Sequence, residues 1–194
     1  MRIYISYPKQ KKLDEFLSKQ QKATFSYTEI ACTKLEKNQP LKIPKGYVED
    51  YNFINIGKGD QTWEKAKTTI QQWKHFPPSF TKIYPNTTKI EAGNIVVVMI
   101  NILGLWCRNP AKIVYTFNKP NRFGFAYGTL QEHAEQGEEA FWISRNSNNQ
   151  ITYHLRAISK PKFWAAKLAY PLARKYQRKF ALESMQNLKD ICKV

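Results

Sequence analysis

The residues best suited to acid–base chemistry fall in one short stretch of the chain, between residues 122 and 141. This stretch contains Tyr127, His133 and the adjacent pair Glu138 and Glu139. Histidine and glutamate are among the side chains that most often transfer protons in enzymes. Neighbouring side chains on a strand point to opposite faces, so Glu138 and Glu139 cannot form a catalytic dyad. One glutamate together with His133 remains the candidate for proton transfer or for polar contact with a ligand.

Glycine and aromatic residues alternate in the first half of the same stretch. On a strand, Gly124 and Gly128 would share one face, and Phe125 and Tyr127 would share the other. Glycines on one face let another segment approach closely or let the sheet bend. We therefore expect either close packing on the glycine face or curvature of the sheet there, and an aromatic wall on the opposite face.

Two further polar residues and two tryptophans are candidates for the same site. His154 and Arg156 alternate along a later strand, where they face either solvent, as we expect, or a polar part of a cavity. Arg156 could pair there with a glutamate of the neighbouring strand. Trp106 and Trp164 are candidate cavity walls, although plain core packing would also explain them. His75, at a helix end, is expected to be a cap or a surface residue.

The spacing of cysteine and histidine predicts neither a metal site nor a disulfide framework. Cys32, Cys107 and Cys192 lie far apart, and no two histidines have the spacing of metal ligands. No serine or cysteine lies in a nucleophile motif, and the region of Gly57 lacks the rest of a phosphate-binding loop. We therefore expect no cofactor and no metal ion.

The charge of the chain limits its partners more sharply than its composition does. With 31 Lys and Arg against 15 Asp and Glu, the formal net charge is +16. Such an excess attracts nucleic acid or an anionic membrane surface; the alternative is a solvated, lysine-rich surface. No apolar run is long enough to span a bilayer, and the first residues do not resemble a secretory leader. We therefore expect a cytoplasmic protein.

The first part of the chain is predicted to contain two helices and two strands. Residues 9–23 form a short amphipathic helix, 25–32 a strand, 34–46 a loop and 47–56 a second strand. Asp60 is a suitable N-cap for a helix that runs to about Lys74. Residues 1–46 are interpreted as an N-terminal extension packed on the domain of residues 47–194, with a single domain overall.

The rest of the chain alternates short apolar runs with turn residues, which is typical of an antiparallel meander. Strands are predicted at residues 80–84, 94–103, 105–117, 123–130, 138–145 and 151–159. Residues 161–191 are predicted to form a long amphipathic helix, kinked or split at Pro171. The predicted fold is therefore α+β: a curved antiparallel sheet of about seven strands wrapped around a long C-terminal helix. This is the helix-grip, or START-like, arrangement, with a short N-terminal helix and an extra strand.

Four segments of the chain resemble a known protein family. The most specific is the run from Arg122 to Leu130 with His133 and residues 137–141, and the others fall within residues 25–33, 46–73 and 159–178. On these residues the chain is similar to the uncharacterised bacterial and plant family numbered nineteen-ninety in the domain-of-unknown-function series. Ala31 and Cys32 replace a glycine-containing step of that family. The resemblance implies a domain rather than a reaction, and with the strand order it indicates the START-like superfamily.

The predicted fold suggests three hypotheses about function. Such folds usually keep an apolar cavity between sheet and helix, so the first is a non-enzymatic protein that binds a hydrophobic or lipid-like small molecule. The expected ligand contacts are Trp106, Phe125, Tyr127, His133, Glu138, Glu139, Arg156 and Trp164. The second is an enzyme of cyclase or hydrolase type, with His133 and a glutamate as acid and base. The third is a binder of anionic membrane or nucleic acid, whose affinity would fall steeply with salt.

Overall fold

The computed structural model describes residues 2–34, 43–162 and 170–193. Over these ranges the strands form one eight-stranded sheet in which every pairing is antiparallel. In chain order the elements are β1 (Arg2–Tyr4), α1 (Gln10–Gln20), β2 (Val48–Lys58), α2 (Gly59–Gln71), β3 (Thr81–Tyr84), β4 (Ile95–Ile102), β5 (Leu105–Lys119), β6 (Arg122–Thr129), β7 (Glu135–Arg145), β8 (Gln150–Pro161) and α4 (Tyr170–Cys192).

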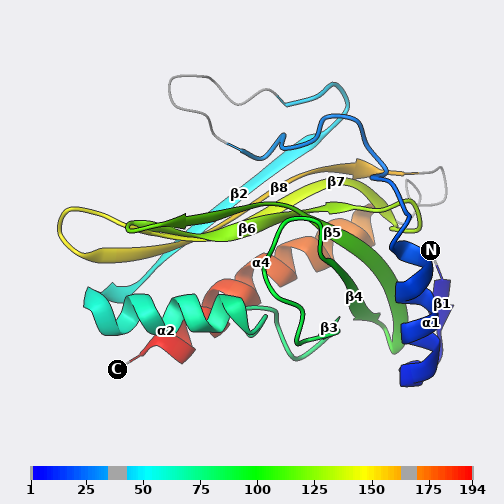
Figure 1. The fold of residues 1–194 in the computed structure, drawn as a ribbon, viewed down its shortest axis with the longest axis horizontal. Helices are drawn as coiled ribbons and strands as arrows, with labels where there is room; N and C mark the ends of the chain where they lie inside the picture. The colour runs from blue at the N-terminus through cyan, green and yellow to red at the C-terminus, as the bar shows by residue number, and fades with distance from the viewer. Residues whose placement is uncertain (1, 35–42, 163–169, 194) are drawn as a thin grey trace.

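The strand order in the sheet is β2-β8-β7-β6-β5-β4-β3, and β1 pairs with the first part of β5. From β3 to β8, neighbours in sequence are neighbours in the sheet, which confirms the predicted meander. β2 lies beside β8, so the first long strand and the last strand are joined. Figure 1 shows α2 and α4 on the same side of this sheet. The predicted α+β helix-grip fold is therefore confirmed.

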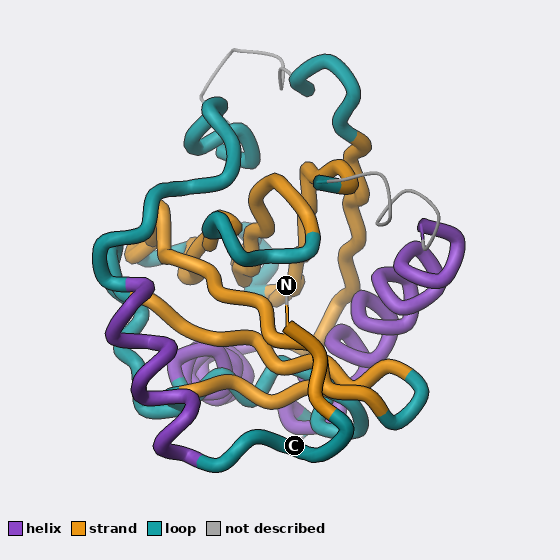
Figure 2. The backbone as a smooth tube through the Cα atoms, turned by 90° about the vertical axis from the view of Figure 1, so that its right-hand side faces the viewer, coloured by secondary structure: helices purple, strands orange, loops and turns teal. Residues whose placement is uncertain are grey.

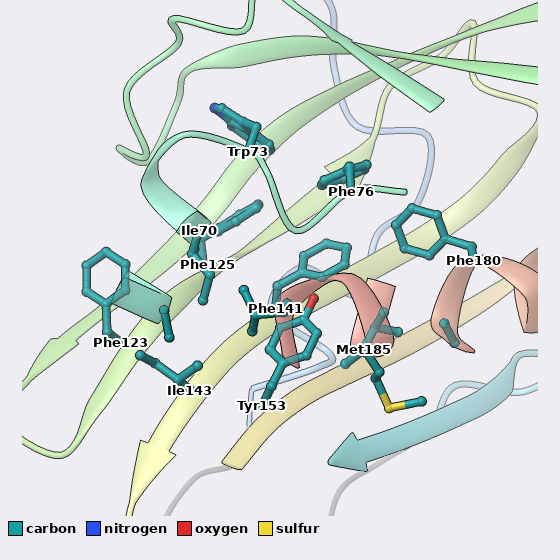
Figure 3. Close-up of a cluster of buried hydrophobic side chains, with 14 of the residues drawn as sticks. Ile70, Trp73, Phe76, Phe123, Phe125, Phe141, Ile143, Tyr153, Phe180 and Met185 are labelled. Carbon is teal, nitrogen blue, oxygen red and sulfur yellow. The ribbon is translucent and has the colours of Figure 1, made fainter. Parts of the chain in front are cut away.

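One half of the concave face of the sheet is filled by α2 and the C-terminal half of α4. Trp63, Ala66 and Ile70, which are three and four positions apart on α2, are buried in the core. The rings of Phe125 and Phe141 lie at its centre, with centroids 5.4 Å apart (Figure 3). From α4 come Phe180, Ala181, Met185, Leu188 and Cys192. Burial of each large apolar side chain stabilises the fold by about 1.5–3 kcal/mol.

A second, smaller cluster lies on the other side of the sheet, beneath α1. Leu13 and Phe16, about one turn apart on α1, pack with Val97 and Met99 of β4. Figure 2 shows α1 and α4 on opposite flanks of the molecule, with strands between them. The main core covers one face of β4 and α1 covers the other. This arrangement explains why the sequence of the strand is apolar on both faces.

In the N-terminal region one predicted strand is wrong and one observed strand is not predicted. Residues 25–32 form an irregular segment with bends and a turn at 30–32 rather than a strand, and within them only Phe25 makes a bridge, to Leu130. The sequence does not predict β1, because three residues are too few for a periodic signal. The extra strand of the sheet is therefore β1, not residues 25–32.

Two predictions around α2 are also wrong. The helix begins at Gly59 with Lys58 at the N-cap position and without a side-chain cap, so Asp60 is not the N-cap. The carboxylate of Asp60 instead accepts a 2.6 Å hydrogen bond from Arg145. His75 is not a surface residue, because it is completely buried among aromatic rings that include Phe76.

Pro171 lies at the N-terminal end of the described helix α4. It is the second residue of Tyr170–Cys192, and the remainder of that helix contains no proline. Pro161, which is predicted to belong to the helix, is the last residue of β8. Trp164 and the other residues between β8 and α4 from 163 to 169 lie outside the described residues. None of the described helices is both long enough and apolar enough to cross a bilayer.

Candidate functional site

A cavity of about 520 Å³ lies between the concave face of the sheet and the N-terminal half of α4. Its apolar wall includes Val98, Ile100, Leu155, Ala157, Phe180 and Ala181. Its polar lining includes Asp50, Tyr127, His133, Glu135, Glu139 and Gln177. The concave face is thus packed with side chains near α2 and hollow beneath the start of α4.

Glu139 and Tyr127 face each other from the adjacent strands β7 and β6. The hydroxyl of Tyr127 donates a 2.6 Å hydrogen bond to Oε2 of Glu139. Burial raises the pKa of Glu139 to about 7, although this hydrogen bond acts in the opposite direction. The part of Glu139 that remains accessible faces the cavity. A carboxyl group in this state can exchange a proton near neutral pH.

A chain of polar contacts connects α4 to β2 and β7 at the edge of the cavity. Both terminal nitrogens of Arg174 donate to the carboxylate of Asp50, with 2.6 Å between Nη2 and Oδ1. Arg174 also donates to Oε1 of Gln177, whose Nε2 donates a 2.7 Å hydrogen bond to Glu135. Two-pronged arginine–carboxylate contacts fix geometry as well as charge. This chain therefore holds the start of α4 over the sheet.

His133 lies in the turn between β6 and β7 and lines the same cavity. Its Nδ1 accepts a 3.0 Å hydrogen bond from the backbone N–H of Glu135, which assigns the proton of the neutral ring to Nε2. Burial lowers the pKa of His133 to about 3, so the ring is neutral near pH 7. Within the described part of the chain, no hydrogen bond joins His133 to Glu139. The two share a cavity without forming a direct acid–base pair.

Glu138 directs its side chain to the opposite, convex face, as strand alternation predicts. It is 2% exposed, and it accepts hydrogen bonds from the Tyr27 hydroxyl (2.8 Å) and the backbone N–H groups of Ala31 (2.9 Å) and Thr33 (3.1 Å). These donors belong to the turns that replace the predicted strand. Although Glu138 borders the cavity, its carboxylate anchors this N-terminal segment.

The glycines of β6 allow other parts of the chain to approach that strand. A Cβ atom on Gly128 would lie 2.2 Å from the hydroxyl of Tyr27, and one on Gly124 would lie 2.1 Å from the carbonyl oxygen of Phe141. At Gly128 the expected close packing on the glycine face is therefore confirmed, whereas Gly124, with φ 156°, lies against the backbone of the paired strand β7. Ala31 has φ 65°, a left-handed conformation that glycine adopts without strain.

Arg156 and His154 lie on the convex face, within an aromatic cluster. The rings of Trp142 and His154 stack with centroids 4.7 Å apart, and the guanidinium of Arg156 lies 4.5 Å from the ring of Tyr51. The Nε atom of Arg156 pairs with Glu49 of β2 at 3.0 Å rather than with a glutamate of β7. Because rings cover it, Arg156 is only 6% exposed, so the expectation of a solvated face is wrong.

Of the remaining predicted contacts, one lies in the main core and one lies in the smaller cluster beneath α1. Phe125 is completely buried in the main core, in the half of the concave face that is filled with side chains. Trp106 packs against Tyr7 beneath α1, with ring centroids 5.1 Å apart. Of the predicted contacts, the structure directs Tyr127, His133 and Glu139 to the cavity; Trp164 is not among the described residues.

Sequence reasoning misses the polar residues that β2, β7 and α4 bring to the cavity and its edge. Asp50 lies in a strand of mixed polarity, and Arg174 is visible only as part of a basic cluster. Glu135 and Gln177 belong to no motif. These side chains meet because β2 pairs with β8 and α4 crosses both, and no local pattern indicates that pairing. The complementary charges of Asp50 and Arg174 are the one signal that could have suggested a contact.

The described residues contain no group of three or more His, Cys, Asp or Glu placed to hold a metal ion. The three cysteines are free. Burial raises the pKa of Cys32 to about 12 and that of Cys192 to about 11, so both remain protonated thiols. Cys107, the cysteine that lines the cavity, also has its pKa raised by burial. Among the described groups of the cavity, Glu139 is suited to exchange a proton near neutral pH, because its pKa is raised to about 7.

Solved structures share this fold at low sequence identity. The 1.88 Å crystal structure of a hypothetical protein from Helicobacter pylori matches with a TM-score of 0.58 and 11% identity, covering 82% of this chain and 98% of that one. Ginseng major latex-like protein 151 from Panax ginseng matches with a TM-score of 0.50 and 11% identity, covering 76% and 99%. Similarity at this level shows the helix-grip fold alone.

Sequence relatives extend over most of the chain. A UPF0548 protein of Dictyostelium discoideum is 27% identical over 197 residues, which cover 93% of this chain and 91% of the relative. A UPF0548 protein of Arabidopsis thaliana is 30% identical over 147 residues, covering 73% and 71%. The family model described as "Domain of unknown function (DUF1990)" matches residues 26–187. The chain therefore belongs to the DUF1990 family, the family that the run from Arg122 to Leu130 indicates.

Proposed function

We propose that this protein binds a small amphipathic molecule in the cavity beneath α4. The volume of about 520 Å³ falls within the range of roughly 300–1,000 Å³ that ligand sites occupy. The wall is largely apolar, and a few polar side chains converge on it from different elements. Apolar walls supply affinity and a small number of polar groups fix the orientation of a ligand. Both features are present in this cavity.

The observation that carries the proposal is the placement of Glu139 and Tyr127. Their hydrogen-bonded side chains extend from two central strands into the hollow part of the concave face. Burial raises the pKa of Glu139 to about 7, so the folded protein holds a carboxyl group in an unfavourable environment. Groups of this kind concentrate at functional sites. A ligand with a polar end near Glu139 would account for it.

A cavity-filling variant tests the proposal. Ala157 of β8 lines the cavity, so Ala157→Phe should fill part of it. Binding of the neutral fluorophore N-phenylnaphthylamine should weaken at least about tenfold, because the lost apolar contact area is worth more than about 1.4 kcal/mol. Thr152→Phe places the same ring on the opposite face of the same strand and should leave binding unchanged. Equal binding by both variants, with both folded, would argue against the cavity.

Acid–base catalysis on the bound molecule is the second candidate function, and one observation favours it. A carboxyl group with a pKa of about 7 is suited to transfer a proton at neutral pH, and Tyr127 orients it. Native mass spectrometry should identify any molecule that copurifies with the protein. Incubation of that molecule with fresh protein distinguishes the two functions: a binding protein leaves both its mass and its NMR spectrum unchanged, whereas an enzyme converts it and Glu139→Gln abolishes the conversion.

A further inference from the structure

The charged groups at the polar end of the cavity are mostly acidic. Glu139 on β7, Glu135 at the start of β7 and Asp50 on β2 all line it. Asp50 is engaged by Arg174 of α4 through both of its carboxylate oxygens. Among the described residues that line the cavity, the cationic one is Arg178, which lies on the exposed side of α4. The cavity therefore offers acidic groups to a ligand, although the chain as a whole carries a net charge of +16.

Glu139 has spare capacity to accept hydrogen bonds. Among the described residues its hydrogen-bond donor is the Tyr127 hydroxyl, which binds Oε2. The nearby charges of Glu135 and Asp50 add to the burial that raises the pKa of Glu139, although Arg174 pairs with Asp50. Tyr153 on β8 lies near Glu139, and the neutral His133 lines the same cavity. The oxygen Oε1 of Glu139 thus remains available to a donor that enters the cavity.

We propose that the ligand is an amphiphile with an apolar body and a protonated amine head, and that the amine binds Glu139 with Glu135 nearby. This inference rests on the proposed function, because it names the chemistry of a ligand for the same cavity. An ammonium group donates hydrogen bonds and compensates a carboxylate that is poorly solvated, and such charge-assisted contacts are the strong ones. A fatty-acid anion would instead place a second negative charge against Glu139 and Glu135, which is unfavourable.

Three molecules with the same apolar chain test the head group. Decylamine, decanol and decanoate compete with N-phenylnaphthylamine at pH 8, where Glu139, with its pKa of about 7, is mainly ionised. Decylamine should displace the fluorophore at a concentration at least about tenfold lower than decanoate, since a hydrogen bond between charged groups exceeds about 1.4 kcal/mol. Decanol should fall between them.

Two matched variants separate the carboxylate from the net charge. Glu139→Gln should weaken decylamine at least about tenfold and change decanol less than about threefold, because only the amine uses the charge. Glu64→Gln, an exposed site on α2 with the same change in charge, should alter neither. Decanoate binding as tightly as decylamine, or an unchanged amine affinity in Glu139→Gln, would overturn the amine assignment while leaving ligand binding intact. Failure of the fluorophore and all three molecules to bind would overturn both proposals.

Discussion

The hydroxyl of Tyr27 donates a 2.8 Å hydrogen bond to Oε2 of Glu138, across 111 positions of the chain. Backbone N–H groups of Ala31 and Thr33 donate to the same carboxylate. One buried side chain on β7 thereby fixes the turns at residues 26–33 against the convex face. Gly128 of the neighbouring strand leaves the space that Tyr27 occupies. Gly128 and Glu138 thus serve one structural purpose, the docking of an N-terminal segment.

Gly128→Ala should destabilise the protein through a steric clash with Tyr27. The new Cβ atom would lie 2.2 Å from the Tyr27 hydroxyl, and the φ angle of Gly128 is not in the left-handed region, so backbone strain adds nothing. Overpacking of this kind lowers the free energy of unfolding by about 1–3 kcal/mol. Urea denaturation measures the loss. In a Tyr27→Phe background the nearest atom is absent, so the loss should be smaller; an equal loss would contradict the docking argument.

Glu138→Gln and Glu139→Gln should have opposite consequences although the residues are adjacent. In Glu138→Gln an amide replaces a carboxylate that accepts several hydrogen bonds. The NH₂ group of the amide must then face groups that are themselves hydrogen-bond donors. The free energy of unfolding should fall by at least about 2 kcal/mol. Glu139→Gln removes a poorly solvated charge, so at pH 8 the free energy of unfolding should stay equal or rise.

Urea denaturation of both variants at pH 8 provides the comparison, and amine binding provides the second measurement. Glu138→Gln should retain binding wherever it is folded, because its carboxylate faces the other side of the sheet. Similar losses of stability in the two variants would show that the two faces are not distinct in the way that the hydrogen bonds indicate.

The fold could be predicted because its signals are local. Each strand of the meander is an apolar run that ends in turn residues, and short connections allow only antiparallel neighbours. Residues 25–32 show the limit of this reasoning. They alternate as a strand does, yet form turns, because backbone donors of Ala31 and Thr33 find the carboxylate of Glu138 instead of a neighbouring strand.

The candidate site could be predicted only in part, because alternation assigns side chains to two faces without saying which face is concave. It separates Glu138 from Glu139 correctly. It cannot show that Arg156 faces the convex side, where Glu49 of a distant strand pairs with it. Nor can it place Asp50 beside Arg174, since that contact depends on how α4 crosses the sheet. The curvature of the sheet and the position of α4 depend on how the whole chain packs, so no local sequence pattern indicates them.

Glu139 should make the protein less stable as pH rises toward neutrality. Its pKa is raised from 4.5 to about 7 on folding, so between these values the folded state binds a proton that the unfolded state has released. The free energy of unfolding should therefore fall by on the order of 2–3 kcal/mol across this interval and level off above pH 7. Urea denaturation from pH 4.5 to 8 should show this fall in the wild type and not in Glu139→Gln. Parallel curves would mean that Glu139 does not titrate in this range.

His75 should act in the opposite direction at acidic pH. Burial among Trp73, Phe76 and Phe141 lowers its pKa from 6.5 to about 3. Below pH 6.5 the unfolded state therefore gains a proton that the folded state does not bind. The free energy of unfolding then decreases by about 1.4 kcal/mol for each unit by which the pH is lowered.

His75→Phe keeps a ring in this aromatic environment and removes the titration. The free energy of unfolding of the variant minus that of the wild type should increase by about 2–3 kcal/mol when the pH is lowered from 7 to 4.5. This change is expected whatever the difference is at pH 7. His133 and His154, whose pKa values are lowered to about 3 and about 4, leave a residual acid sensitivity in the variant. A difference between variant and wild type that does not change with pH would show that His75 is protonated equally in the folded and unfolded states, contrary to its complete burial.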